Sequence, residues 1–459
     1  MPTRRSFLAG AAGATSLSGS ANNSVRLRTH EWFGDRLETF TFPAGWEIDV
    51  RHMKGWQASP LDSGSIGQAV LDPVGTRPLR EIAAGKKTVA IAFDDLTRPT
   101  PACEVVPHIV AELRAAGIRD ENILFVTAYG CHYQMNGMEV EKKLGREAVR
   151  RHPWINHNIW ENLADLGTSS YGNHVQINTY YHKADVKITL SGLKAHGTPG
   201  YGGGPKLILP GVSGIKTIRY MHLELKQKPR ARVKDGIPIY RMWENEQRQD
   251  MIEAARMAGV DFSVQMVYNQ DRRLVKVVAG DIVSAHHRAA RYAVNHLATA
   301  YAKDADIVVV NAYPKGSQLH EHFGWGDRGL KDGGSIVVIN QNPMGEYVWH
   351  YLDEASFNKG RSWFAQRDSR KRRFPQARQV LLYSQYLQKR ELDNPYFPPE
   401  AVGLYAWEDV IARLKREHKG DVKVAVYPLR RHPARHRYAR PARPRLTMVG
   451  PVPLDRHRR

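Results

Sequence analysis

The feature that most constrains the fold is an early alternation of short apolar runs with a helix-like segment. The run Thr88–Phe93 is apolar and contains β-branched residues, which predicts a buried strand. Apolar side chains then recur at helical spacing from Val105 to Leu113, until Gly117 ends the pattern. A second apolar run, Asn122–Val126, follows after a short turn. Strand, helix and strand in this order predict a βαβ unit in a parallel sheet.

The same alternation continues along the rest of the chain. Further strands are predicted at Val186–Leu190, Val260–Tyr268, Asp306–Val310, Ser335–Asn340 and Val422–Tyr427, and helices at Asp250–Ala258, Ala285–Ala302 and Trp407–Glu417. We therefore expect an α/β protein with two α/β domains, mainly parallel sheets and an active-site cleft between the domains. The expected limits are residues 24–285 for the N-terminal α/β domain and residues 286–428 for the C-terminal α/β domain.

Residues 1–23 differ in composition from this body. The pair Arg4-Arg5 precedes a weakly apolar stretch rich in Ala and Gly, which is the layout of a cleavable twin-arginine export signal. This interpretation places the mature protein in the periplasm. A basic, unstructured N-terminus on a cytoplasmic protein fits the same residues.

Residues 429–459 are rich in Arg and Pro and are predicted to form a disordered tail. From Pro428 onward, ten Arg against one Asp supply +9 of the formal net charge of +21, which leaves +12 for the rest of the chain. Only one aromatic residue, Tyr438, lies among these arginines, so we expect no nucleic acid as a partner. No run of about 18 apolar residues occurs, so no membrane span is expected. The two cysteines, Cys103 and Cys131, are too few for a disulfide scaffold or a Cys-rich metal site.

Polar side chains follow the first two predicted strands. Asp95, Thr97 and Arg98 lie in a loop that Pro99 stiffens, and His132 follows the next strand. The carboxyl ends of parallel strands are where α/β proteins bind ligands. An Arg in such a place suits a bidentate grip on a carboxylate or phosphate. An Arg–Asp pair that fixes the turn explains the same residues equally well, and a single His is more often structural.

The most unusual segment is Ser191–Gly211, which contains seven Gly and three Pro. Such a density of glycine suggests a backbone that approaches a ligand closely, with His196 and Lys206 held at fixed positions. The segment is not a phosphate-binding Walker loop, because neither Ser nor Thr follows Lys206 and the required glycine spacing is missing.

Taken in order, these residues resemble the nickel-pincer-dependent lactate racemase family, which racemises or epimerises 2-hydroxyacids. The resemblance rests on the Asp-Leu-Thr-Arg-Pro-Thr-Pro loop and on the His that follows Tyr-Gly-Cys. It rests further on the spacing of His196, Lys206 and His222, which lie ten and then sixteen residues apart. It covers roughly residues 25–430 and implies that the N-terminal domain binds the cofactor.

The cofactor of that family is the nickel-pincer nucleotide, pyridinium-3-thioamide-5-thiocarboxylic acid mononucleotide with bound nickel. A lysine of the Gly-rich loop joins it through a thioamide, and a histidine completes the nickel coordination. The resemblance gives these roles to Lys206 and His222. The other cofactor contacts that it implies are Asp95, Thr97, Gly203 and Gly204.

The same resemblance makes His132 and His196 the two acid/base residues and gives Arg98 the substrate carboxylate. Removing hydride from C2 while a histidine takes the hydroxyl proton yields a planar 2-keto acid, and this avoids ionising a weakly acidic C–H bond. Hydride return to either face then inverts the configuration. The implied partners are a 2-hydroxyacid substrate and the enzymes that build the cofactor.

One segment departs from the lactate-specific members. Where they carry a Tyr-Gln pair and, three residues later, a Lys, this chain has His320, Glu321 and Gly324. The lost cation and the added acid predict a larger or polyhydroxylated 2-hydroxyacid, such as an aldonate, in contact with His320 and Glu321. Two other functions stay open: a related oxidoreductase acting on sugar acids, and a periplasmic protein that binds carboxylates or nickel without turnover.

Overall fold

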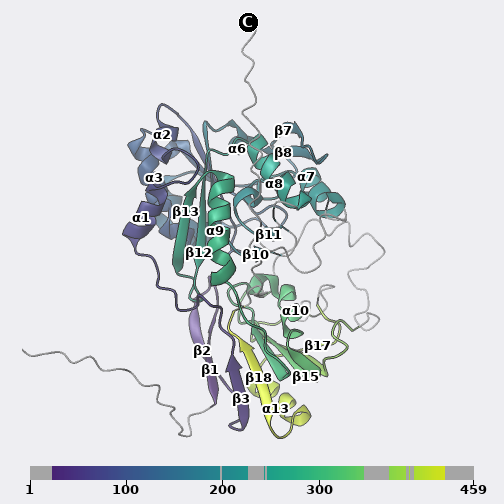
Figure 1. Cartoon of the computed structure of the whole chain (residues 1–459). Helices are drawn as coiled ribbons and strands as arrows, with labels where there is room; N and C mark the ends of the chain where they lie inside the picture. Colours follow the sequence, from purple (N-terminus) through teal and green to yellow (C-terminus); the bar gives the residue numbers. More distant parts are fainter. Residues whose placement is uncertain are drawn as a thin grey trace, which may run out of the picture.

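The structure is a computed structural model, shown in Figure 1. It describes residues 23–196, 199–225, 242, 245–345, 372–388, 392 and 397–429, without the side chain of His320. The predicted export signal and the predicted tail lie outside the described residues, apart from Asn23 and Leu429. Within the described ranges, no helix has both the length and the apolar character that a membrane span requires.

The first sheet has six strands in the order β13-β12-β9-β4-β5-β6 (Figure 1). Its strands are β4 (Val89–Phe93), β5 (Ile123–Thr127), β6 (Trp154–Asn156), β9 (Val186–Gly192), β12 (Phe262–Tyr268) and β13 (Leu274–Gly280). Neighbouring strands run parallel except β12 and β13. Side chains of β4 alternate between two apolar cores: Val89, Ile91 and Phe93 enter one, and Ala90 and Ala92 enter the other. A parallel strand buried on both faces reads as a continuous apolar run, as the sequence does here.

Helices cover both faces of this sheet. They are α1 (Ser63–Leu71), α2 (Leu79–Ala83), α3 (Val106–Ala115), α4 (Gly137–Leu144), α5 (Arg146–Arg151), α6 (Thr179–Lys183), α7 (Ile215–Arg219), α8 (Glu246–Met257) and α9 (Ile282–His296). Helix α4 begins with a capping box, in which Asn136 and Glu139 each accept a hydrogen bond from the other's backbone N–H. Short antiparallel pairs add β1 (Ser24–Thr29) to β2 (Arg36–Thr41), β7 (Leu163–Thr168) to β8 (His174–Asn178), and β10 (Ala195–His196) to β11 (Gly200–Tyr201).

The second sheet also has six strands, in the order β17-β16-β15-β14-β18-β3, and all neighbours are parallel. Its strands are β3 (Trp46–Val50), β14 (Ala305–Asn311), β15 (Leu330–Ile339), β16 (Gln379–Tyr383), β17 (Ala401–Leu404) and β18 (Val422–Tyr427). After β14 come a 3-10 segment, η8 (Gly316–Glu321), and helix α10 (Phe323–Gly326); helix α13 (Trp407–Glu417) precedes β18. Figure 1 shows α10 at the end of this sheet that faces the β10–β11 pair.

The expected α/β fold with mainly parallel sheets is confirmed. The domain limits and the cleft between the domains stay predictions. One strand and one helix do not follow the expected limits. Strand β3, from the N-terminal range, pairs with β18. Residue 285 lies inside α9, whose buried alanines pack with Val267 and Val275 of the first sheet. The helical spacing of apolar residues that suggested a boundary near residue 285 belongs to one face of α9. Because α9 packs against the first sheet, this spacing does not mark the start of the second domain.

Polar contacts join the segment after β1 to the loop that follows β14. Glu31 is fully buried and accepts hydrogen bonds from the backbone N–H of Gly316 (2.5 Å) and from the side chain of Asn342 (2.7 Å). Burial raises the pKa of Glu31 to about 7, although both hydrogen bonds oppose the rise. Asp35 forms an ion pair with Arg272, which lies in the turn between β12 and β13, and accepts a hydrogen bond from Tyr313 (2.8 Å). These contacts fix where the 313–321 loop lies.

Candidate active site

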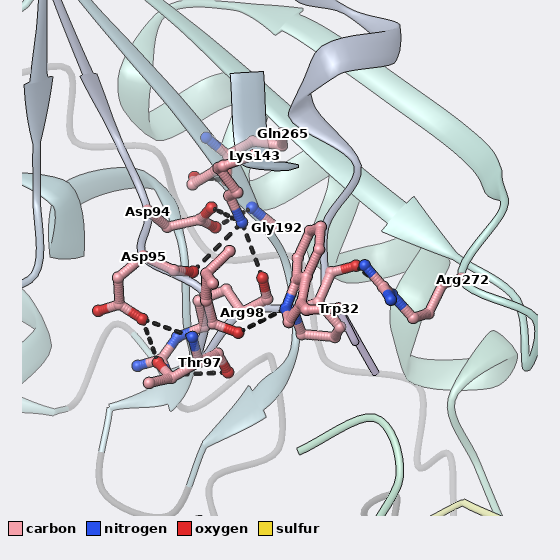
Figure 2. A network of polar contacts seen from close by, with 12 residues as sticks. Trp32, Asp94, Asp95, Thr97, Arg98, Lys143, Gly192, Gln265 and Arg272 are labelled. Carbon is pink, nitrogen blue, oxygen red and sulfur yellow. Dashed lines mark hydrogen bonds and ion pairs between the residues drawn. The ribbon is translucent and has the colours of Figure 1, made fainter. Parts of the chain in front are cut away.

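A buried ion pair holds the loop that follows β4 (Figure 2). The Nζ atom of Lys143 lies 2.5 Å from Oδ1 of Asp94 and donates hydrogen bonds to the carbonyl oxygens of Arg98 (2.7 Å) and Asp95 (3.3 Å). The other carboxylate oxygen of Asp94 accepts a hydrogen bond from the N–H of Gly192 at the end of β9 (2.7 Å). Burial raises the pKa of Asp94 and lowers that of Lys143, and each partner opposes the shift of the other. Lys143 therefore braces the loop after β4, and Asp94 links that loop to the end of β9.

The outer side of the same loop is also fixed. The indole Nε1 of Trp32 donates to the carbonyl oxygen of Leu96 (2.8 Å), and the guanidinium of Arg272 donates to that of Pro99 (3.0 Å). Arg272 stacks on Trp32, 3.8 Å from the ring centroid, as Figure 2 shows. Lys143 on one side and Trp32 with Arg272 on the other therefore fix the backbone of the loop after β4, which gives its side chains defined positions.

We expect Lys143→Met to destabilise the chain by about 3–5 kcal/mol, because it leaves the buried Asp94 carboxylate without its cation. Chemical unfolding followed by circular dichroism measures this change. Lys142→Met is the matched control, since Lys142 lies 3.9 Å over the Phe33 ring and should cost less than about 1 kcal/mol. Equal effects of the two substitutions would contradict the role of the ion pair.

Asp95 and His132 form a second buried pair. The carboxylate accepts hydrogen bonds from Nδ1 of His132 (2.7 Å) and from the backbone N–H and hydroxyl of Thr97. Burial would raise the pKa of Asp95, but the neighbouring His132 and Arg98 outweigh it and hold that pKa below its usual value. Burial lowers the pKa of His132 even though Asp95 opposes the shift. A neutral His132 bound in this way keeps its proton on Nδ1 and the lone pair that can accept a proton on Nε2.

The Gly-rich segment brings His196 and Lys206 together. His196 ends β10, Lys206 lies in the 3-10 turn Gly204–Leu207, and Nε2 of His196 is 3.1 Å from Nζ of Lys206. Burial lowers the pKa of Lys206 well below its usual value, and the positive charges of Arg98 and Arg248 lower it further. The pKa of His196 is also well below its usual value, through burial and then Lys206 and Lys194. The result is an amine and an imidazole that are both held towards their neutral, nucleophilic forms.

Two glycines allow this turn to form. Gly203 and Gly204 have φ angles of +76° and +56°, which L side chains rarely adopt. A Cβ atom on Gly203 would meet the side chain of Gln265 at 2.7 Å, and one on Gly204 would meet the ring of His286 at 2.7 Å. The structure thus explains both glycines by backbone conformation and close packing.

Further cations surround this pair. Arg98 donates to the hydroxyl of Thr97 (2.6 Å) and forms no ion pair with Asp95, so the alternative of a turn-fixing Arg–Asp pair does not hold. Lys315 forms an ion pair with Glu321. Lys194 lies beside Lys315 and within electrostatic range of Arg98, and burial followed by these charges lowers its pKa well below the usual value.

His222 lies on the helical segment that continues α7. Its Nδ1 lies 3.0 Å from the carbonyl oxygen of Ile218, and because a carbonyl only accepts, Nδ1 carries the proton. The lone pair is then on Nε2, as a metal ligand requires. Ile218 packs with Cys131, which is within electrostatic range of Lys206. Among the side chains that the structure describes, no three His, Cys, Asp or Glu residues form a group able to hold a metal ion.

Most of the predicted site residues therefore occupy one region. Arg98, His132 and His196 lie around Lys206. Glu321 is within electrostatic range of His196, and Thr97 supports Asp95. The side chain of His320 lies outside the described residues. Sequence reasoning missed Lys194 and Lys315 as parts of this region. Lys315 of the same segment as Gly324 brings a lysine to this region, and Glu321 pairs with it.

The chain is similar to known proteins over most of its length. Residues 33–234 match the family described as the lactate racemase N-terminal domain. The lactate racemase of Thermoanaerobacterium thermosaccharolyticum is 30% identical over 283 residues, 60% of this chain and 64% of that protein. The chain thus matches slightly less than two thirds of the length of that relative. The lactate racemase of Lactiplantibacillus plantarum is 27% identical over 63% of this chain and 69% of that protein.

Solved structures show the same fold. The lactate racemase apoprotein from Thermoanaerobacterium thermosaccharolyticum superposes with a TM-score of 0.63 at 21% identity, over 88% of this chain and 98% of that chain. A crystal structure of a protein from Thermotoga maritima gives a TM-score of 0.56 at 16% identity, over 80% and 96%. The sequence matches support the lactate racemase family, and the solved structures show that the chain has the fold of the lactate racemase apoprotein.

Proposed function

We propose that this chain is an isomerase that inverts C2 of a 2-hydroxyacid with a nickel-pincer nucleotide attached to Lys206. The observation that carries the proposal is the cluster of His132 and His196 around Arg98 and Lys206. Two bases held towards their neutral forms beside a carboxylate-binding cation suit proton transfer on a hydroxyacid. The similarity to lactate racemases supports the same reaction class.

The described residues fit the cofactor. A buried amine with a lowered pKa is a competent nucleophile for the thioamide bond. His222 offers an imidazole with its lone pair on Nε2, and imidazole is a suitable ligand for nickel. With one protein ligand of this kind, the remaining donors would come from the sulfur atoms of the cofactor. Asp95, Thr97, Gly203 and Gly204 stay proposed cofactor contacts.

The chain's own residues bind the substrate and move its hydroxyl proton. Arg98 binds the carboxylate at C1, which fixes C2 and its hydroxyl group between the two histidines. Asp95 orients His132, so Nε2 of that ring accepts the proton of one enantiomer. His196 serves the other enantiomer, and each ring returns the proton in the reverse direction. The bound cofactor supplies the hydride acceptor for C2.

We expect activity to fall as the pH drops through the pKa of His132, because only the neutral ring accepts a proton. Since burial lowers this pKa, the acid limb of the kcat/KM profile lies below the ordinary value of 6.5. The negative charge of Asp95 raises the pKa of His132 and so opposes the effect of burial. Asp95→Asn removes this charge, so the acid limb of the kcat/KM profile should move to still lower pH while the rate falls. A limb that moves to higher pH in Asp95→Asn would contradict the assignment.

Conversion of one enantiomer into its mirror image, or of one epimer into the other, tests the proposed function. The chain is co-produced with enzymes that build the cofactor, given single enantiomers of 2-hydroxyacids, and the products are resolved by chiral chromatography. Inversion without net redox change supports an isomerase. Accumulation of a 2-keto acid, or tight binding without any turnover by cofactor-loaded chain, would contradict it.

The same proposal includes the size of the substrate, the partner proteins and the location of the chain in the cell. The substrate is an acid larger than lactate, because Glu321 and His320 replace the pair that the lactate-specific members carry. The enzymes that build the cofactor are the partners. Export through the twin-arginine route delivers an already loaded protein to the periplasm; detection of only the uncleaved chain, in the cytoplasmic fraction, would reject export.

A further inference from the structure

The β1–β2 hairpin packs in the apolar cores of both sheets. Val25 and Leu27 of β1 and Phe40 of β2 belong to the core of the second sheet. The hairpin loop, residues 30–35, joins these two strands, and its Trp32 belongs to the core of the first sheet. The hairpin therefore reaches from one sheet to the other.

One side of the hairpin loop holds the loop after β4 (Figure 2). Nε1 of Trp32 donates to the carbonyl oxygen of Leu96 (2.8 Å), and Arg272, stacked on the Trp32 ring, donates to that of Pro99 (3.0 Å). Arg272 also forms an ion pair with Asp35, whose Oδ1 accepts a hydrogen bond from the backbone N–H of Trp32 (2.9 Å). Trp32 and Arg272 are thus bound to each other and to two carbonyl groups of the loop after β4.

The other side of the hairpin loop holds the loop after β14. Glu31 accepts hydrogen bonds from the backbone N–H of Gly316 (2.5 Å) and from the side chain of Asn342 (2.7 Å). Asp35 accepts a hydrogen bond from the hydroxyl group of Tyr313 (2.8 Å). A continuous chain of contacts therefore runs from the loop after β4, through the hairpin loop, to the loop after β14.

The backbone at this contact is strained. Among the residues that the structure describes, five other than glycine have a positive φ, and three of them belong to this contact: His30 (+61°), Trp32 (+68°) and Arg272 (+63°). Bulky L side chains rarely adopt such angles, and they keep them only where the surrounding contacts hold the backbone. Nε2 of His30, for example, lies 2.8 Å from the hydroxyl oxygen of Tyr386. Strain of this kind concentrates at functional loops and clamps.

We infer that the hairpin loop couples the loop after β4 to the loop after β14, with Trp32 and Glu31 as the positioning residues. The first of these loops carries Arg98, and the second carries the ion pair of Lys315 and Glu321. The hairpin loop then sets how far apart these groups lie. The inference goes beyond the proposed function, because the coupling requires neither cofactor nor substrate.

Hydrogen–deuterium exchange of the full chain, resolved to single residues by mass spectrometry, tests the coupling. In the loop after β4, the reporters are the backbone N–H groups of Thr97 and Arg98, which bond to Asp95. In the loop after β14, they are those of Lys315 and Gln318, which bond to carbonyl oxygens of the same loop. None of these four groups bonds to the hairpin loop, so faster exchange reports motion of the loop that carries the group.

Trp32→Leu removes the hydrogen bond to the loop after β4 and the ring on which Arg272 stacks. Glu31→Ala removes the hydrogen bonds to the loop after β14. Each substitution is expected to speed exchange by about tenfold in both loops, because the lost contact holds one loop directly and the other through the hairpin loop. A residue that supported only its own loop would change exchange in that loop alone.

Trp46→Leu is the matched control. Trp46 is 8% exposed and Trp32 9%, but Trp46 lies at the start of β3 in the core of the second sheet. This control should change exchange in both loops by less than about threefold. Glu31→Gln keeps an acceptor oxygen and should restore exchange to within about threefold of the wild-type rates. Trp32→Phe keeps a ring under Arg272 but loses the N–H donor; its intermediate effect on both loops decides the question if Trp32→Leu does not fold.

Two results would overturn the inference. Faster exchange confined to the loop after β4 in the Trp32 variants, and to the loop after β14 in Glu31→Ala, would show two separate contacts without coupling. An equal acceleration in Trp46→Leu would assign the effect to a general loss of stability. Exchange is measured without cofactor or substrate, so failure of the proposed isomerase activity would leave the result on coupling unchanged.

Discussion

Lys206→Ala is expected to give a folded chain that carries no cofactor and has no isomerase activity. The amine of Lys206 is the proposed attachment point, and burial lowers its pKa well below the usual value, which favours the neutral, nucleophilic amine. Intact-mass spectrometry after co-production with the cofactor-building enzymes measures the adduct. The wild-type chain should show the added mass, and the variant should show the bare chain.

Lys216→Ala is the matched control, since Lys216 is an exposed lysine on α7 close to the same segment. It should keep the adduct and the activity. An adduct on Lys206→Ala, or its loss from both variants, would contradict attachment through Lys206. Thermal unfolding of all three proteins shows whether a missing adduct reflects the lost amine or a lost fold.

His132→Gln and His196→Gln are each expected to lower kcat by about 1,000-fold in both directions, because each direction uses one ring as base and the other as acid. Both variants should keep the cofactor adduct, since neither removes the amine. Chiral chromatography started from each enantiomer measures the two rates. His108→Gln is the control, because Nε2 of His108 lies 3.2 Å from the hydroxyl of Ser63 on α1, away from the proposed site.

A small loss of kcat in either His132→Gln or His196→Gln would contradict a two-base mechanism. The equilibrium constant fixes the ratio of kcat/KM in the two directions, so a loss of kcat in one direction alone would have to be matched by a change in KM. If His196→Gln also lost the adduct, the 3.1 Å contact between His196 and Lys206 would matter for attachment rather than for proton transfer.

Much of the fold could be predicted because its central strands are buried on both faces. Strand β4 and the helix and strand after it follow from apolar runs and helical spacing, and α13 and β18 end where the sequence pattern ends. Strand β3 could not be found in this way. Its alternation is weak, and its partner β18 is more than 370 residues away, so only tertiary pairing makes Trp46–Val50 a strand.

The candidate site was predicted in part for a similar reason. Asp95, Arg98 and His132 follow neighbouring parallel strands, so topology alone brings them to one edge. Lys143 comes from a helix whose sequence has two adjacent lysines, and nothing local shows which one is buried. Lys194 had a usable signal: a lysine two residues before His196 in the Gly-rich segment. Its meaning depends on Lys315, which the fold brings from the loop after β14.

The most direct test of the central claim is the nickel content per chain after co-production with the cofactor-building enzymes. Elemental analysis of wild-type, Lys206→Ala and His222→Ala protein is compared at equal protein concentration. The account predicts about one nickel per wild-type chain, none in Lys206→Ala and a strong loss in His222→Ala. A folded wild-type chain without nickel, or one whose nickel survives the loss of Lys206, would contradict the account.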